Sequence, residues 1–194
     1  MSQVKISTAD NRTLLGFWIY LMTDCVLFGS LFATYAVLHQ NTFGGPSGQD
    51  LFELPYVLVE TLLLLTSSFT AGVAILAAKA GRKKQVIGWL VATLLLGLSF
   101  LVMEIVEFQE ILSSGYSWET SGFLSSFFTL VATHGAHITI GLIWIGVMVW
   151  RVWKLGITQG NLRRLMIFSL FWHFLDVVWI FIFTIVYLMG VIGI

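Results

Sequence analysis

The sequence is poor in residues that soluble proteins use freely. Its 194 residues include one cysteine, two prolines and only 10% charged residues. A lone cysteine cannot form an internal disulfide, so Cys25 is interpreted as a small buried apolar residue. The ten basic and ten acidic residues balance, so the chain has no net charge that would attract nucleic acid. These shortages exclude a disulfide scaffold and argue against a nucleic-acid-binding protein.

Hydrophobic residues are abundant instead. They make up 58% of the chain, with a mean hydropathy of +0.91, whereas a soluble domain contains roughly 45–50% apolar residues. Continuous apolar runs of about the 20 residues that a helix needs to cross a bilayer occur five times. They cover approximately residues 16–38, 55–78, 86–108, 123–150 and 166–189. We therefore predict an all-α membrane protein, a bundle of five transmembrane helices forming a single membrane domain over 1–194.

The basic residues indicate the orientation of the bundle. They gather in the connections after the second and fourth predicted spans, and the other two connections contain none. They are Lys79, Arg82, Lys83, Lys84, Arg151, Lys154, Arg163 and Arg164. Because loops rich in Lys and Arg stay cytoplasmic, we predict a cytoplasmic N-terminus and, after five crossings, a periplasmic C-terminus. Lys5 and Arg12 before the first span agree with this orientation.

Ionisable residues inside the predicted spans are the candidates for function. Such groups cost several kcal/mol at membrane depth unless they pair or face a cavity, so each suggests a site. The eight candidates are Asp24, Glu60, Glu104, Glu107, His134, His137, His173 and Asp176.

Six of the eight form motifs that place two polar side chains on one helical face, three residues apart. The motifs are EIVE at 104–107, HGAH at 134–137 and HFLD at 173–176. A helical rise of about 1.5 Å per residue places Asp24, His173 and Asp176 roughly 10–15 Å deep, and the other five farther out. We therefore expect two polar layers, with Asp24 as a candidate partner of His173. This separation argues against one site using all three motifs, and against a haem between His173 and either of the other two histidines.

Three interpretations of the polar residues stay open at this point. The outer layer, with Glu60, Glu104, His134 and His137, could form the metal centre of a membrane enzyme. The chain could instead be a small transporter, although we find neither internal repeats nor helices interrupted at the midplane. We favour a third interpretation, in which the polar groups hydrogen-bond between helices that small residues such as Gly97 and Gly141 let approach closely.

Longer stretches of the sequence carry a family resemblance. The resemblance covers nearly all of the chain after about residue 14, both in residue identity and in the order of the segments. They read LGFWIYLMTDCVLFGSLFATYAVL, GGPSGQDLFELPYVLVET, EIVEFQE, FFTLVATHGAHITIGLIWIG and FWHFLDVVWIFIFTIVYLMG. These segments strongly resemble subunit III of the haem–copper respiratory oxidases, in particular the quinol-oxidising branch of that family.

The resemblance implies a noncatalytic subunit of a proton-pumping terminal quinol oxidase in the bacterial inner membrane, which oxidises ubiquinol and reduces oxygen to water. It implies subunits I, II and IV as partners, with haem and copper in subunit I, no metal or catalytic residue in this chain, and bound phospholipid. Asp24 matches the family's buried, carbodiimide-reactive acid. Most of the other candidates match recurring family motifs, whereas Glu60 is associated only with the quinol-oxidase branch.

Overall fold

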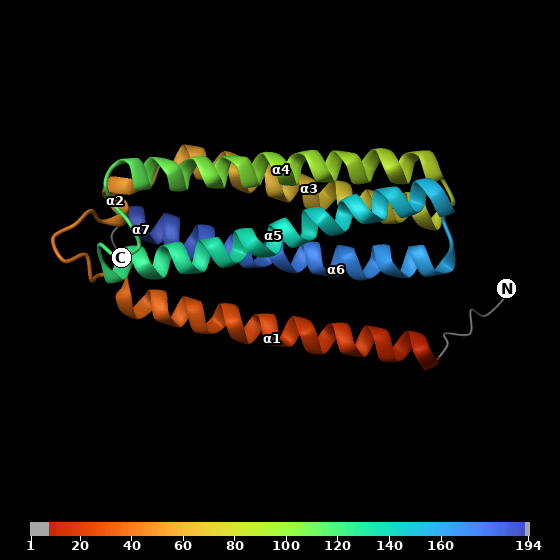
Figure 1. Ribbon diagram of the computed structural model, residues 1–194, viewed down its shortest axis with the longest axis horizontal. Helices are drawn as coiled ribbons and strands as arrows, with labels where there is room; N and C mark the ends of the chain where they lie inside the picture. Colours follow the sequence, from red (N-terminus) through yellow and green to blue (C-terminus); the bar gives the residue numbers. More distant parts are fainter. Residues whose placement is uncertain (1–7, 193–194) are drawn as a thin grey trace.

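The protein is described here as a computed structural model covering residues 8–192. It contains five long helices that run side by side (Figure 1). They are α1 (Thr8–Leu38), α3 (Leu54–Lys79), α4 (Lys83–Ser113), α5 (Gly122–Leu155) and α6 (Gln159–Ile182), which continues as π-helix η1 (Phe183–Leu188) and α7 (Met189–Ile192). Within 8–192 there is no strand. The prediction of an all-α membrane protein with five spanning helices is confirmed, while Lys5 lies outside the described residues.

The helices extend beyond the apolar runs from which they were predicted. α1 begins at Thr8 rather than near Gly16, and α5 ends at Leu155 rather than near Trp150. Hydropathy locates the part of a helix that suits lipid, but intrahelical hydrogen bonds continue into the polar flanks until a cap or a turn ends them. A short helix, α2 (Gly48–Leu51), also lies in the connection between α1 and α3.

Local sequence signals set several helix ends. The Ser121 hydroxyl accepts a hydrogen bond from the Leu124 amide at the start of α5, and Thr158 does the same for the Asn161 amide at the start of α6. Gly156, which follows α5, has a φ of 70°, a left-handed conformation that glycine adopts without strain. α5 and α6 are therefore joined by a short turn and lie antiparallel.

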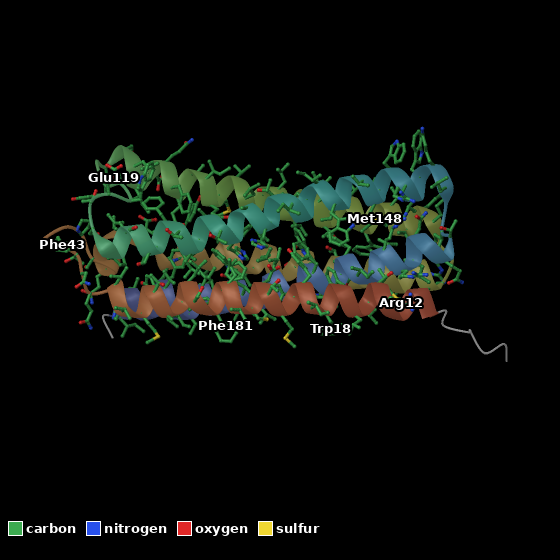
Figure 2. All side chains as sticks on the ribbon, turned by 60° about the horizontal axis from the view of Figure 1, so that its bottom comes forward. Arg12, Trp18, Phe43, Glu119, Met148 and Phe181 are labelled. Atoms are coloured by element: carbon green, nitrogen blue, oxygen red, sulfur yellow. The ribbon has the colours of Figure 1, made fainter. Side chains whose placement is uncertain are left out.

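The basic and the acidic residues of the connections lie at opposite ends of the bundle. Figure 2 shows Arg12 at one end, and Phe43 and Glu119 at the other. The turn between α3 and α4 and the turn between α5 and α6, which hold most of the basic residues, lie at the Arg12 end (Figure 1). The structure thus gathers the basic connections on one side of the spanning region.

Small residues allow helices α4, α5 and α6 to approach closely. A Cβ atom built on Gly97 would lie 2.9 Å from the Trp172 ring, and one on Gly141 would lie 2.6 Å from the same ring. Trp172 is buried and donates a hydrogen bond from Nε1 to the Ser67 hydroxyl on α3. One tryptophan therefore packs into notches on two helices and hydrogen-bonds to a third.

Helix α1 is the least enclosed of the five. It packs chiefly against α5 and α6, and Figure 1 shows it along one side of the bundle. Its outward face carries exposed apolar side chains, including Leu15, Trp18, Met22 and Val26. Cys25 is also exposed, so the expectation that it is buried is wrong, because it lines an open groove between α1 and α6 and is not packed inside the bundle.

Candidate functional site: polar groups inside the bundle

The structure buries six of the eight polar candidates. Their exposed fractions are 8% or less, and they are Asp24, Glu60, Glu104, Glu107, His134 and Asp176. His137 is partly buried. His173 is exposed, so the expectation that it is buried is wrong. An apolar run shows that a helix is in the membrane but not which of its faces packs inward, and His173 lies on the outward face beside the buried Trp172.

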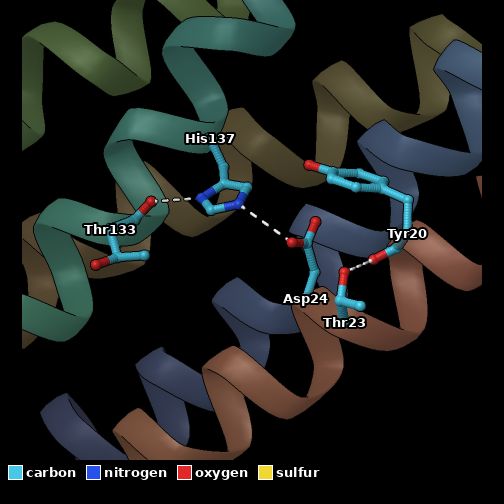
Figure 3. Close-up of polar contacts among 5 residues, drawn as sticks. All are labelled: Tyr20, Thr23, Asp24, Thr133 and His137. Carbon is cyan, nitrogen blue, oxygen red and sulfur yellow. Dashed lines mark hydrogen bonds and ion pairs between the residues drawn. The ribbon is translucent and has the colours of Figure 1, made fainter.

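Asp24 on α1 and His137 on α5 form the contact shown in Figure 3. The Asp24 Oδ1 atom lies 3.7 Å from His137 Nε2. On the other side of the ring, Nδ1 lies 2.7 Å from the Thr133 carbonyl oxygen. A carbonyl oxygen only accepts hydrogen bonds, so Nδ1 carries a hydrogen and Nε2 is the nitrogen that faces the carboxyl group. Tyr20, one turn earlier on α1, also lies close to Asp24 (Figure 3).

This contact contradicts the two predicted layers. Asp24 was expected about two turns nearer the cytoplasm than His137, with His173 as its partner. At a rise of about 1.5 Å per residue, Asp24 lies about 24 Å from the start of α1, and His137 about 27 Å from the end of α5. The prediction was wrong because it measured depth from the edge of each apolar run, whereas α1 begins two turns before that edge.

A second group of polar residues lies between α3, α4 and η1. The carboxyl groups of Glu60, Glu104 and Glu107 are close enough to interact electrostatically. The Tyr187 hydroxyl, on η1, donates a 2.7 Å hydrogen bond to Glu107 Oε2. Neither oxygen of Glu60 or of Glu104 has a hydrogen-bond partner among the described residues.

His134 is enclosed by aromatic rings. Its ring stacks on Trp179, with centroids 5.3 Å apart and an interplanar angle of 30°, and meets the edge of Phe100 at 6.0 Å. The residue is fully buried and neither ring nitrogen has a hydrogen-bond partner among the described residues. Although it lies one turn from His137, its environment is apolar packing rather than an ion pair.

Asp176 forms a third, separate polar position. It lies on α6, near Ser68 of α3 and His173 of its own helix. Asp24 instead contacts His137 of α5. The HFLD motif therefore contributes one buried acid and one exposed histidine.

The candidates do not converge into a metal centre. Over the residues that the structure describes, no group of three or more His, Cys, Asp or Glu side chains is arranged to hold a metal ion. The outer-layer metal site therefore has no ligand set here: Glu104 packs against Gly135, and His134 is enclosed by Trp179 and Phe100.

Two residues that hydrogen-bond within the polar groups could not be identified from the sequence. Tyr187 and Trp179 look like ordinary aromatic residues of an apolar run, but Tyr187 donates to Glu107, and Trp179 donates a 3.1 Å hydrogen bond from Nε1 to Thr61. The π-helix that carries Tyr187 leaves no clear signal in the sequence. Such segments inside α-helices are frequent at functional sites.

The fold and these positions define a multi-pass helical membrane protein whose buried acids and histidines connect its helices. Comparison with known families agrees: residues 6–191 match the family model described as cytochrome c oxidase subunit III. The chain belongs to this family, and the resemblance noted in its sequence motifs is confirmed.

Individual relatives match over nearly the whole chain. It is 58% identical over 182 residues to cytochrome bo(3) ubiquinol oxidase subunit 3 of Pseudomonas aeruginosa, covering 94% of this chain and 87% of the relative. It is 49% identical to quinol oxidase subunit 3 of Bacillus subtilis, covering 96% and 92%. It is also 49% identical to cytochrome c oxidase subunit 3 of a Bacillus species, strain PS3, covering 92% and 86%. The family thus includes subunits named for either electron donor.

Proposed function

We propose that this chain is the noncatalytic subunit III of a proton-pumping terminal quinol oxidase, which oxidises ubiquinol and reduces oxygen to water. The observation that carries the proposal is the 58% identity to a subunit named for ubiquinol oxidation, over 94% of the chain. The relative named for cytochrome c is less similar, at 49%. The chain is placed in the bacterial inner membrane as one membrane domain, with its N-terminus cytoplasmic and its C-terminus periplasmic.

In this role the chain supports other subunits rather than the redox chemistry. Subunits I, II and IV are its partners, and haem and copper belong to subunit I. The exposed apolar side chains of α1, with Met22 63% and Val26 73% exposed, suit contact with another membrane subunit or with lipid. The buried polar groups then serve to connect helices, as Asp24 and His137 connect α1 to α5.

Bound phospholipid forms part of the proposal. An apolar groove of about 260 Å³ runs between α1 and α6. Its lining includes Cys25, Phe28, Phe32, Phe174 and Phe181. A groove of this character, open towards the membrane, suits an acyl chain rather than a polar substrate.

Copurification tests the assignment. The tagged chain, extracted from its native membrane in mild detergent, is expected to bring with it a haem–copper subunit and ubiquinol oxidase activity. Recovery of the intact, folded chain without any haem-containing partner would contradict the proposal. Oxidation of reduced cytochrome c but not of ubiquinol by the recovered complex would retain the family and overturn the quinol assignment.

A further inference from the structure

The charges of Glu60, Glu104 and Glu107 are not balanced by any basic side chain nearby. The described lysines and arginines lie at the opposite end of the helices, in Arg12 and in the turns around residues 79–84 and 151–164. The exposed fractions of the three glutamates are 0%, 2% and 7%. Three unpaired carboxylates cannot share such an apolar environment, because an isolated buried charge is far more costly than a buried neutral group.

Side-chain donors do not resolve this imbalance. Tyr187 donates to Glu107, but no described group donates to Glu60 or Glu104. The nearby Tyr56 hydroxyl is directed elsewhere, to the Met103 carbonyl oxygen at 3.1 Å. A partner subunit cannot supply a lysine or arginine to Glu60, because that side chain is completely covered by this chain.

His134 is a further buried polar group in the same half of the bundle, and it supplies no donor to the glutamates. It is fully buried with both ring nitrogens unpartnered among the described residues. Trp179 connects it to the glutamates: the indole stacks on His134, lies 6.0 Å from the Tyr187 ring, and donates to Thr61, the residue after Glu60. Buried polar side chains are hydrogen-bonded in the large majority of cases, so a cluster of buried acids without a described cation, two of them without a described donor, favours carboxyl groups held in their neutral form.

Two further features of the structure accommodate the glutamate side chains. Gly135 makes room for Glu104, since a Cβ atom there would lie 2.6 Å from Glu104 Oε1. The π-helix η1 carries Tyr187, whose hydroxyl reaches Glu107. The missing side chain at Gly135 and the position of Tyr187 on η1 thus both accommodate the acids.

We propose that Glu60, Glu104 and Glu107 form a proton-binding site inside the half of the bundle opposite the basic turns. Protons are the ligand, held as neutral carboxylic acids, with Tyr187 as the fixed donor to Glu107. No metal ion is needed, and no metal-ligand arrangement exists among the described residues. The proposal goes beyond the accessory role, since it assigns bound protons to residues of this chain. It does not depend on whether the chain is part of a quinol oxidase.

Infrared spectroscopy of the purified native complex tests the site. Neutral carboxylic acids give a C=O stretching band well separated from that of carboxylates, and exchange into D2O lowers its frequency. We expect Glu60→Gln and Glu104→Gln each to remove part of this band from the wild-type spectrum, because each variant lacks one carboxylic acid. Glutamine preserves the shape and neutrality of the side chain, so the fold should be kept. Glu119→Gln is the matched control, since Glu119 is an exposed acid in the connection between α4 and α5, and it should leave the band unchanged.

The wild-type spectrum at neutral pH gives a readout that does not depend on the folding of a variant. The groups facing the site are Tyr56 of α3, Glu110 of α4, His134 of α5 and Tyr187 of η1. None of these is a fixed cation, so the band should be present in the spectrum of the wild-type complex at neutral pH. Carboxylate bands at neutral pH that are lost in both glutamine variants would overturn the proposal. So would a stoichiometric metal ion that the wild type retains and Glu60→Gln loses.

Discussion

Asp24 on α1 faces His137 on α5, with Oδ1 3.7 Å from Nε2 and with Nδ1 of the histidine bound to the Thr133 carbonyl oxygen. Because Nδ1 of His137 is hydrogen-bonded to the Thr133 carbonyl oxygen, Nε2 is the nitrogen that faces Asp24. Because α1 has a largely exposed apolar face, this pair is well placed to set the position of α1 along α5.

Replacing Asp24 tests that role. Asp24→Asn keeps the size of the side chain and can donate an amide hydrogen to Nε2, so we expect normal assembly and substantial quinol oxidation. Asp24→Leu leaves Nε2 unpaired and should lower stability by about 1–3 kcal/mol. The measurement is the amount of this chain in the purified oxidase and its thermal unfolding. Complete loss of activity in a fully assembled Asp24→Asn complex would contradict the noncatalytic assignment.

Reaction with an apolar carbodiimide is expected to mark Asp24. The residue lies within a spanning helix and is 7% exposed, whereas Glu53 lies exposed in a connection. A reagent that partitions into lipid should reach Asp24 from the membrane, so mass spectrometry should find the label there in preference to Glu53. Asp24→Asn should abolish it. Labelling of Glu53 at the same or a higher level would contradict the expected preference for Asp24.

The packing of Glu104 against Gly135 predicts a cost for a single methyl group. Gly135→Ala would place a Cβ atom 2.6 Å from Glu104 Oε1, and overpacking of this kind costs about 1–3 kcal/mol. Gly146→Ala on the same helix is the control, because nothing lies within 4 Å of its added Cβ atom. Thermal unfolding of the complex should fall only for Gly135→Ala. Adding Glu104→Ala should recover part of the loss, and equal effects at both glycines would contradict the described packing.

Topology reporters test the orientation. Since the basic turns lie at one end of the bundle, loops at that end should stay cytoplasmic. A reporter inserted within 80–85 or 155–163 is expected to read cytoplasmic, and one fused to the C-terminus to read periplasmic. A cytoplasmic reading at the C-terminus would contradict the five-span orientation.

Much of the architecture follows from local chemistry. Apolar runs of spanning length predict five helices because lipid offers the backbone no hydrogen-bond partners, so each segment must satisfy its own. Ser121 and Thr158 mark helix starts by the same local logic. The motifs also indicated the family, because long segments resemble it in residue identity and in order.

The arrangement of the polar site did not follow in the same way. The spacing in HGAH and HFLD places two side chains on one helical face, yet His134 is packed among aromatic rings, His137 meets Asp24, and His173 is exposed. Spacing gives relative direction along one helix. It contains no information about the rotation of that helix towards its neighbours.

By itself the sequence determined the solvent, the number of spanning helices and the family, because each depends on residue type and order along the chain. Tertiary structure alone decided that Asp24 pairs with His137 and not His173, and that Tyr187 donates to Glu107. These contacts join residues distant in the chain, and they depend on where α1 begins and on a π-helix within the last span. A shift of one turn moves a side chain by about 5.4 Å, enough to exchange one polar partner for another.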